Sequence, residues 1–121
     1  MAKTIVVAED FNTSRKIIVS TLAKEGFNVL EGADGREAAA LFDGRTIDLL
    51  VTDFNMPNMN GAELIKEVRS KSKYEYIPIL LLTTEVREEK IRQAIDGNIT
   101  AMIKKPFKAD EFLKVVTRAL R

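Results

Sequence analysis

The sequence contains neither cysteine nor histidine. Without cysteine the chain has no disulfide, no thiolate nucleophile and no cysteine-ligated zinc or iron–sulfur centre. Without histidine it has no Ser-His-Asp triad, no imidazole acid–base catalysis and no histidine-ligated metal. Any chemistry at this protein therefore uses carboxylates, hydroxyls, lysines and hard cations.

An excess of charge of either sign is also missing, as is any apolar run long enough to cross a bilayer. Nineteen basic residues against eighteen acidic ones leave a net charge of +1. No overall field therefore draws the chain to nucleic acid or to an anionic membrane. The first four residues lead directly into a strand-like run and lack the apolar region of a signal peptide. We expect a cytoplasmic protein that binds neither nucleic acid nor membrane.

The 121 residues are enough for one domain, residues 1–121, and too few for two. Short β-branched runs alternate along the chain with segments of helical spacing. The strand-like runs are Thr4–Ala8, Asn28–Glu31, Ile47–Thr52, Ile77–Thr83 and Ile99–Ile103. Several are apolar at consecutive positions, as in a parallel sheet covered by helices on both faces. We predict an α/β fold of five βα units in a doubly wound parallel sheet, because crossovers between parallel strands are right-handed.

Apolar stripes and helix-end signals mark the segments between these runs. In the first segment, Ile17, Ile18, Thr21 and Leu22 recur at helical spacing and form a predicted buried stripe. Gly26 and Gly44 lie where the first two helices should end, since glycine commonly follows the last helical turn.

Polar side chains gather at one edge of the predicted sheet. Ligands of an open parallel sheet bind beyond the carboxyl ends of the strands, and four of the five strands deliver a polar group there. These residues are Glu9 and Asp10 after the first strand, Asp53 after the third, Thr83 and Thr84 at the end of the fourth, and Lys105 after the fifth. Polar residues commonly begin where strands end, which explains one or two of these positions but not the whole set.

The three acids of this set repel one another. At separations of ~5 Å and an effective dielectric constant of about 20, each pair costs ~3 kcal/mol, so the three pairs together cost ~10 kcal/mol. One lysine does not offset three carboxylates, so either a pKa rises steeply or a divalent cation lies among them. Oxygen ligands favour Mg²⁺, Mn²⁺ or Ca²⁺, and the alternating acids of a Ca²⁺ loop are absent. Mg²⁺, with Mn²⁺ as a substitute, fits best.

A divalent cation, an aspartate, a lysine and a hydroxyl are the groups that transfer a phosphoryl group onto a carboxylate. The six glycines are scattered and form neither a Walker A loop nor a dinucleotide fingerprint, which argues against a nucleotide as direct donor. Because the chain has no histidine, a phosphohistidine donor must belong to another protein.

Four motifs in order resemble the receiver domain of two-component response regulators, most closely the stand-alone CheY-like type. They are Ala8-Glu-Asp-Phe11, Val51-Thr-Asp-Phe-Asn-Met-Pro-Asn-Met-Asn-Gly61, Leu82-Thr-Thr-Glu85 and Ile103-Lys-Lys-Pro-Phe107, each after the appropriate strand. The resemblance covers essentially the whole chain. It implies a flavodoxin-like sheet with strand order 2-1-3-4-5.

The resemblance also implies a role for each matching residue. Asp53 would accept the phosphoryl group, and it would form the Mg²⁺ site together with Glu9, Asp10 and the carbonyl of Asn55. Thr83 would be the switch hydroxyl, and Lys105 would bind the phosphoryl group. The bond between Lys105 and Pro106 would be cis. Thr84 and Glu85 would modulate the switch. With Asn55 and Glu85 beside the path of water, the phosphoryl group would be short-lived.

Two positions depart from the chemotaxis members of the family. Glu9 stands where those proteins usually carry Asp, and its longer side chain would act through a metal-bound water. Met102 stands where the family usually has Tyr or Phe, so a partner that reads a ring there is not expected. Phe11, Phe54 and Phe107 flank the acids, and we interpret them as wedges that pack loops onto the sheet.

The resemblance predicts a signalling switch that catalyses only its own phosphorylation and dephosphorylation. A sensor histidine kinase or phosphotransfer protein would be the donor, and a target protein would bind the monomer at its fourth helix, fifth strand and fifth helix. No output domain follows Arg121, so the chain is either a single-domain regulator or a fragment. Two alternatives remain: a degenerate receiver that only binds proteins, and a Mg²⁺-dependent aspartyl phosphatase. The phosphatase would need an acid where Asn55 stands.

Overall fold

Five parallel strands form one sheet in the order β2-β1-β3-β4-β5, which confirms the predicted fold and strand order. The structure is a computed structural model, and it describes residues 2–84, 89, 91, 95 and 98–121. The strands are β1 (Thr4–Ala8), β2 (Asn28–Gly32), β3 (Leu49–Asp53), β4 (Ile79–Thr83) and β5 (Ala101–Lys104). The helices are α1 (Asn12–Lys24), α2 (Gly35–Ala40), α3 (Gly61–Ser70), the short 3₁₀ helix η1 (Ser72–Tyr74) and α5 (Ala109–Ala119).

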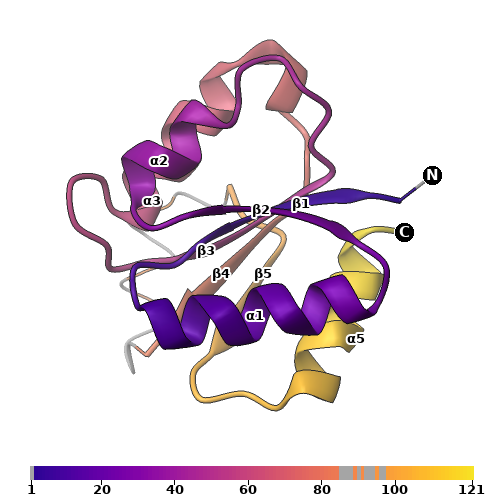
Figure 1. Cartoon of the computed structure of the whole chain (residues 1–121). Coiled ribbons are helices and arrows are strands. Elements are labelled where there is room, and N and C mark those ends of the chain that lie inside the picture. The colour runs from indigo at the N-terminus through magenta and orange to yellow at the C-terminus, as the bar shows by residue number, and fades with distance from the viewer. Residues whose placement is uncertain (1, 85–88, 90, 92–94, 96–97) are drawn as a thin grey trace.

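Helices cover both faces of the sheet, with α1 and α5 on one face and α2 and α3 on the other (Figure 1). Alternate residues of each strand supply the two cores. Ile5 and Val7 pack with α1 and α5, whereas Val6 and Ala8 pack with α2 and α3. All five residues of β3 are buried, which places this strand at the centre of the molecule. In the described part of the chain, no helix has both the length and the apolar character of a bilayer span.

The strand β1 has the predicted boundaries, and each of the other strands differs from its prediction by one or two residues at one or both ends. The strands β3, β4 and β5 each begin two residues later than their apolar runs, because Ile47, Ile77 and Ile99 pack against the core before pairing starts. One stripe prediction was wrong: Ile17 is 61% exposed and lies on the solvent side of α1, while Ile18 and Leu22 are buried. The prediction for Ile17 relied only on the apolar character of its side chain.

A glycine permits the close approach of α3 to the end of β3. A Cβ atom on Gly61 would lie 2.4 Å from the carbonyl oxygen of Asp53, and the Gly61 N–H donates to the carbonyl of Phe54. The side chains of Asn60 and Glu63 form a capping box that satisfies the free N–H groups at the start of α3. The loop after Asp53 is therefore held at both of its ends.

Tyr74 links η1 to the loop before β3 through two hydrogen bonds of its hydroxyl. The hydroxyl accepts from the N–H of Gly44 at 2.8 Å and donates to the carbonyl of Arg45 at 2.6 Å. Tyr74→Phe should lower the free energy of unfolding by about 1–2 kcal/mol, because both backbone partners lose their bond. Urea unfolding followed by circular dichroism measures this, with Tyr76→Phe as control because Tyr76 is 88% exposed. Equal stability of the two variants would contradict the assignment.

Candidate functional site

Three carboxylates meet at the carboxyl edge of the sheet. Glu9 follows β1 and Asp53 ends β3, and each lies one residue beyond the paired residues Ala8 and Thr52 of these neighbouring strands. One carboxylate oxygen each of Glu9, Asp10 and Asp53 lies within 4.8 Å of the others. Glu9 and Asp53 are buried, whereas Asp10 is exposed to solvent. The predicted convergence of the acids is confirmed.

Lys105 reaches into this cluster from the end of β5. Its Nζ donates to Glu9 Oε2 at 2.7 Å and lies 2.6 Å from Asp53 Oδ1. The second contact is too poorly aligned to count as a hydrogen bond. Asp53 Oδ1 is the one buried side-chain polar atom without a hydrogen bond among the described residues. The backbone N–H of Lys105 donates to Thr83, and the following bond to Pro106 is cis, as the resemblance implies.

The protonation of the cluster follows from its burial. Burial raises the pKa of Asp53 to about 8, and the neighbouring Glu9 adds to the rise while Lys105 opposes it. Burial also acts to raise the pKa of Glu9, but hydrogen bonds with Asp53 and Lys105 outweigh it and hold that pKa below its ordinary value. Without a divalent cation, Asp53 thus retains its proton at neutral pH and Glu9 is charged. The rise in the pKa of Asp53 therefore comes first from burial and second from Glu9, and not from crowding of all three acids.

The acids line a cavity of about 390 Å³ that is open to solvent. Thr83, Thr84, Asn55 and Lys105 also line it, so it brings together most residues selected from the sequence. Thr83 is buried, whereas Thr84 and Asn55 are exposed.

The other candidate residues do not line the acidic cavity in the part of the chain that the structure describes. Pro106 lines an adjoining apolar cavity, and Met102 packs against the core on the α2–α3 side. Glu85 lies outside the described residues.

The phenylalanine interpretation holds for two of three residues. Phe54 packs against the core, and the ring of Phe107 stacks on that of Phe112 with centroids 5.1 Å apart. Phe11 was wrongly interpreted as a wedge, because it is 63% exposed. Ser14, which the sequence argument missed, also lines the acidic cavity from the first turn of α1. No single-sequence signal distinguishes this serine from other exposed serines.

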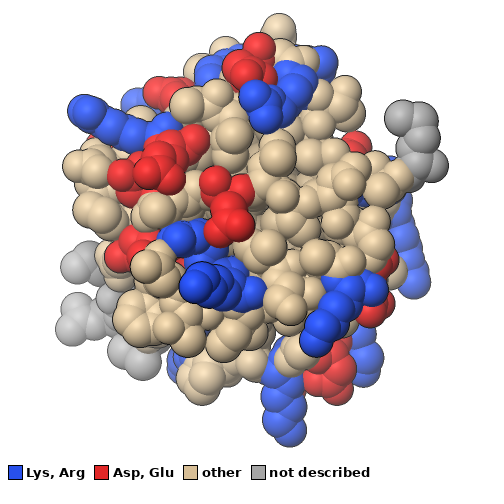
Figure 2. Space-filling view, viewed as in Figure 1, with Lys and Arg blue, Asp and Glu red and all other residues tan. Residues whose placement is uncertain are grey.

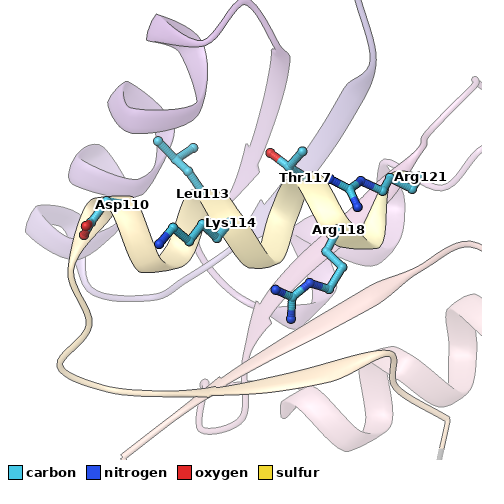
Figure 3. A pocket seen from close by; sticks show the side chains of 6 residues that line it. All are labelled: Asp110, Leu113, Lys114, Thr117, Arg118 and Arg121. Atoms are coloured by element: carbon cyan, nitrogen blue, oxygen red, sulfur yellow. The ribbon is translucent and has the colours of Figure 1, made fainter.

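A second cavity of about 380 Å³ lies along α5 and is separate from the acidic site. Figure 3 shows its lining side chains, five from α5 and the last from the residue that ends the chain: Asp110, Leu113, Lys114, Thr117, Arg118 and Arg121. Three of the six are cationic. Elsewhere, acidic and basic side chains are interleaved on the molecular face of Figure 2, in keeping with the small net charge.

Comparison with known proteins identifies the family. Residues 5–117 match the family model described as "Response regulator receiver domain". The chain belongs to the response regulator receiver family. Receiver domains are signalling domains and not classical enzymes, so the aspartyl-phosphatase alternative has no support from this receiver domain's relatives.

Chemotaxis proteins are among the relatives of this receiver domain. The chemotaxis protein CheY of Pseudomonas aeruginosa is 36% identical over 106 residues, which cover 87% of this chain and 86% of that protein. The CheY homolog of Campylobacter jejuni is 41% identical over 105 residues, with 85% and 81% covered.

Solved structures agree with the fold of the receiver domain. CheY4 of Vibrio cholerae superimposes with a TM-score of 0.92 at 36% identity and covers 99% of this chain and 100% of that one. The receiver domain of the sensor kinase PA1611 from P. aeruginosa, solved with magnesium in its active-site cleft, has a TM-score of 0.90 at 22% identity and covers 99% and 98%.

Proposed function

We propose that residues 1–121 act as a receiver that takes a phosphoryl group onto Asp53 in a Mg²⁺-dependent reaction and then binds a target protein through an altered surface. The observation that supports this most directly is the surroundings of Asp53. Its buried carboxylate lies 2.6 Å from Lys105 Nζ and shares a cavity with two further acids and a threonine hydroxyl.

The oxygen atoms of the cluster fit a hard divalent cation. Glu9, Asp10 and Asp53 each offer a carboxylate oxygen, and the buried Asp53 Oδ1 lacks a hydrogen bond. Such a donor set suits Mg²⁺ or Mn²⁺ and does not suit a soft metal. The carbonyl of Asn55 is proposed as a further ligand. Bound Mg²⁺ would neutralise charge on the carboxylates and on the phosphoryl oxygens.

The transfer uses the side chains around Asp53. An Asp53 Oδ atom attacks the phosphorus of a phosphohistidine on a partner protein, so the Oδ–P bond forms. The P–N bond breaks, and the imidazole nitrogen keeps the electron pair. Lys105 pairs with one phosphoryl oxygen and the Thr83 hydroxyl donates to another, because both groups line the cavity. Asn55 and Glu85 would leave water a path to the acyl phosphate, so we propose that it decays without a phosphatase.

The donor and the target are proposed from the family and the relatives. A sensor histidine kinase or phosphotransfer protein would carry the phosphohistidine, and the chemotaxis relatives favour a chemotaxis target. Phosphorylation would draw Thr83 toward the phosphoryl group and bias β5, α5 and the predicted fourth helix toward a binding-competent state. Most of that fourth helix lies outside the described residues. Met102 on β5 would fill the space that Thr83 leaves, because methionine is flexible.

Intact-mass spectrometry after treatment with acetyl phosphate and Mg²⁺ tests the proposal. The wild-type protein should gain the mass of one phosphoryl group, and Asp53→Asn should gain none, because an amide oxygen is a poor nucleophile and forms no stable adduct. Asp48→Asn is the matched control, since Asp48 accepts from the N–H of Thr4 outside the site. A wild-type protein that gains no mass would favour the degenerate, protein-binding alternative.

A further inference from the structure

Arg15, in the first turns of α1, has a mostly buried side chain whose donors go to three different acceptors. Its Nη1 donates to the backbone carbonyl of Glu9 at 2.9 Å, its Nε to Glu31 Oε1 at 2.9 Å, and its Nη2 to Asn12 Oδ1 at 2.5 Å. Only 13% of the side chain is exposed, against 49% for Glu31. The guanidinium therefore ties the loop that follows β1 to the end of the edge strand β2.

The bond to Glu9 fixes the backbone that carries the acids. The N–H of Glu9 donates to the carbonyl of Gly32 at 3.2 Å, and the carbonyl of Glu9 accepts from Arg15. Both backbone polar groups of Glu9 are therefore hydrogen-bonded, one to the end of β2 and one to Arg15. The Glu9 carbonyl and the Asp10 N–H belong to one planar peptide unit. Holding that carbonyl consequently fixes the direction in which the chain enters Asp10.

The position of the Asp10 carboxylate depends on the Arg15–Glu9 hydrogen bond more than that of the Glu9 carboxylate does. The Glu9 carboxylate is held directly, by the N–H of Phe11 at 3.1 Å and by Lys105. The Asp10 carboxylate is exposed and has no hydrogen bond or ion pair to another described residue. Its place within 4.8 Å of the other two acids therefore comes from the backbone.

We infer that Arg15, held by Glu31, is a positioning residue of the cation site: it orients the Glu9–Asp10 peptide so that the Asp10 carboxylate converges with Glu9 and Asp53. The inference rests on the proposed function, since it concerns the affinity of these acids for Mg²⁺. The role needs a planar, forked cation. A lysine would keep the charge, but its single nitrogen does not reach Glu9, Glu31 and Asn12 in their separate directions.

Arg15→Lys keeps the positive charge but removes the forked geometry of the guanidinium. Glu31→Gln weakens the bond that holds Arg15 and changes no residue of the cation site. Arg45→Lys is the matched control, because Arg45 pairs with Asp43 at 2.9 Å in an exposed ion pair. Titration calorimetry with Mg²⁺ alone, on protein shown to be folded by circular dichroism, measures the affinity. We expect the dissociation constant to rise about tenfold in Arg15→Lys and about threefold in Glu31→Gln, and to be unchanged in Arg45→Lys.

Amide hydrogen exchange supplies a readout that does not depend on the metal. In EDTA, the amides of Glu9 and Phe11, which donate to Gly32 and to the Glu9 carboxylate, should exchange faster in Arg15→Lys than in the wild-type protein or in Arg45→Lys. A Mg²⁺ affinity of Arg15→Lys within twofold of wild type overturns the inference and leaves the proposed function standing. If Arg15→Lys does not fold, unchanged affinity in Glu31→Gln overturns it. If the wild-type protein itself binds no Mg²⁺, the proposed function fails.

Discussion

Lys105→Met is expected to slow the phosphorylation of Asp53 by roughly 100-fold or more, because it removes the preorganised cation that faces the developing charge. The same change should lower the free energy of unfolding in EDTA at pH 8 by about 2 kcal/mol. Lys105 Nζ donates to the buried carboxylate of Glu9, which is charged at this pH, and removing the lysine leaves that charge uncompensated.

Lys104→Met is the matched control, since Lys104 is adjacent in sequence and exposed. Phosphorylation by acetyl phosphate, followed over time by intact-mass spectrometry, gives the rate, and urea unfolding gives the stability. Equal rates in the two variants would contradict the assignment of Lys105 to the reacting site. A loss of rate with unchanged stability would contradict only the ion-pair argument.

Asp53→Asn is expected to stabilise the protein in EDTA at alkaline pH, by on the order of 2 kcal/mol at pH 9. Because the pKa of folded Asp53 is about 8 and the ordinary value is 3.8, the proton bound by the folded state favours folding at low pH. This contribution is fully present below about pH 4 and is lost as the pH rises through 8. The asparagine variant has no such proton, so its advantage should disappear as the pH falls toward 4.

Urea unfolding of the two proteins between pH 4 and 9 measures this dependence. Mg²⁺ should reverse the order of stability at pH 9, because it binds and stabilises the wild-type carboxylates more than the variant. Parallel stability curves at all pH values would show that burial and Glu9 do not raise the pKa of Asp53.

The sheet and the convergence of the acids could be predicted from the sequence because both depend on local pattern and strand polarity. Strands of parallel direction deliver their carboxyl ends to one edge, so Glu9 and Asp53 had to be neighbours once β1 and β3 were paired. The repulsion among the acids could be predicted in the same way. The sequence did not decide whether a raised pKa or a bound cation relieves that repulsion.

Features that depend on packing could not be predicted. Ile17 and Phe11 have the apolar side chains of core residues, yet both are exposed, because the orientation of α1 against the sheet decides which residues it buries. Arg15 has the sequence character of a solvated helix residue. Its bonds to Glu9 and Glu31 arise only because β2 ends beside the first turns of α1.

Proton release on Mg²⁺ binding tests the central claim most directly, since it reports at once on the cation and on Asp53. Calorimetric titrations at pH 7 in buffers of different ionisation enthalpy give the number of protons released. With the pKa of Asp53 at about 8, binding at pH 7 should release about one proton per Mg²⁺, and almost none well above pH 8. Asp53→Asn should release none at either pH. Mg²⁺ binding without proton release at pH 7, or no binding by the wild-type protein, would contradict this account of the site.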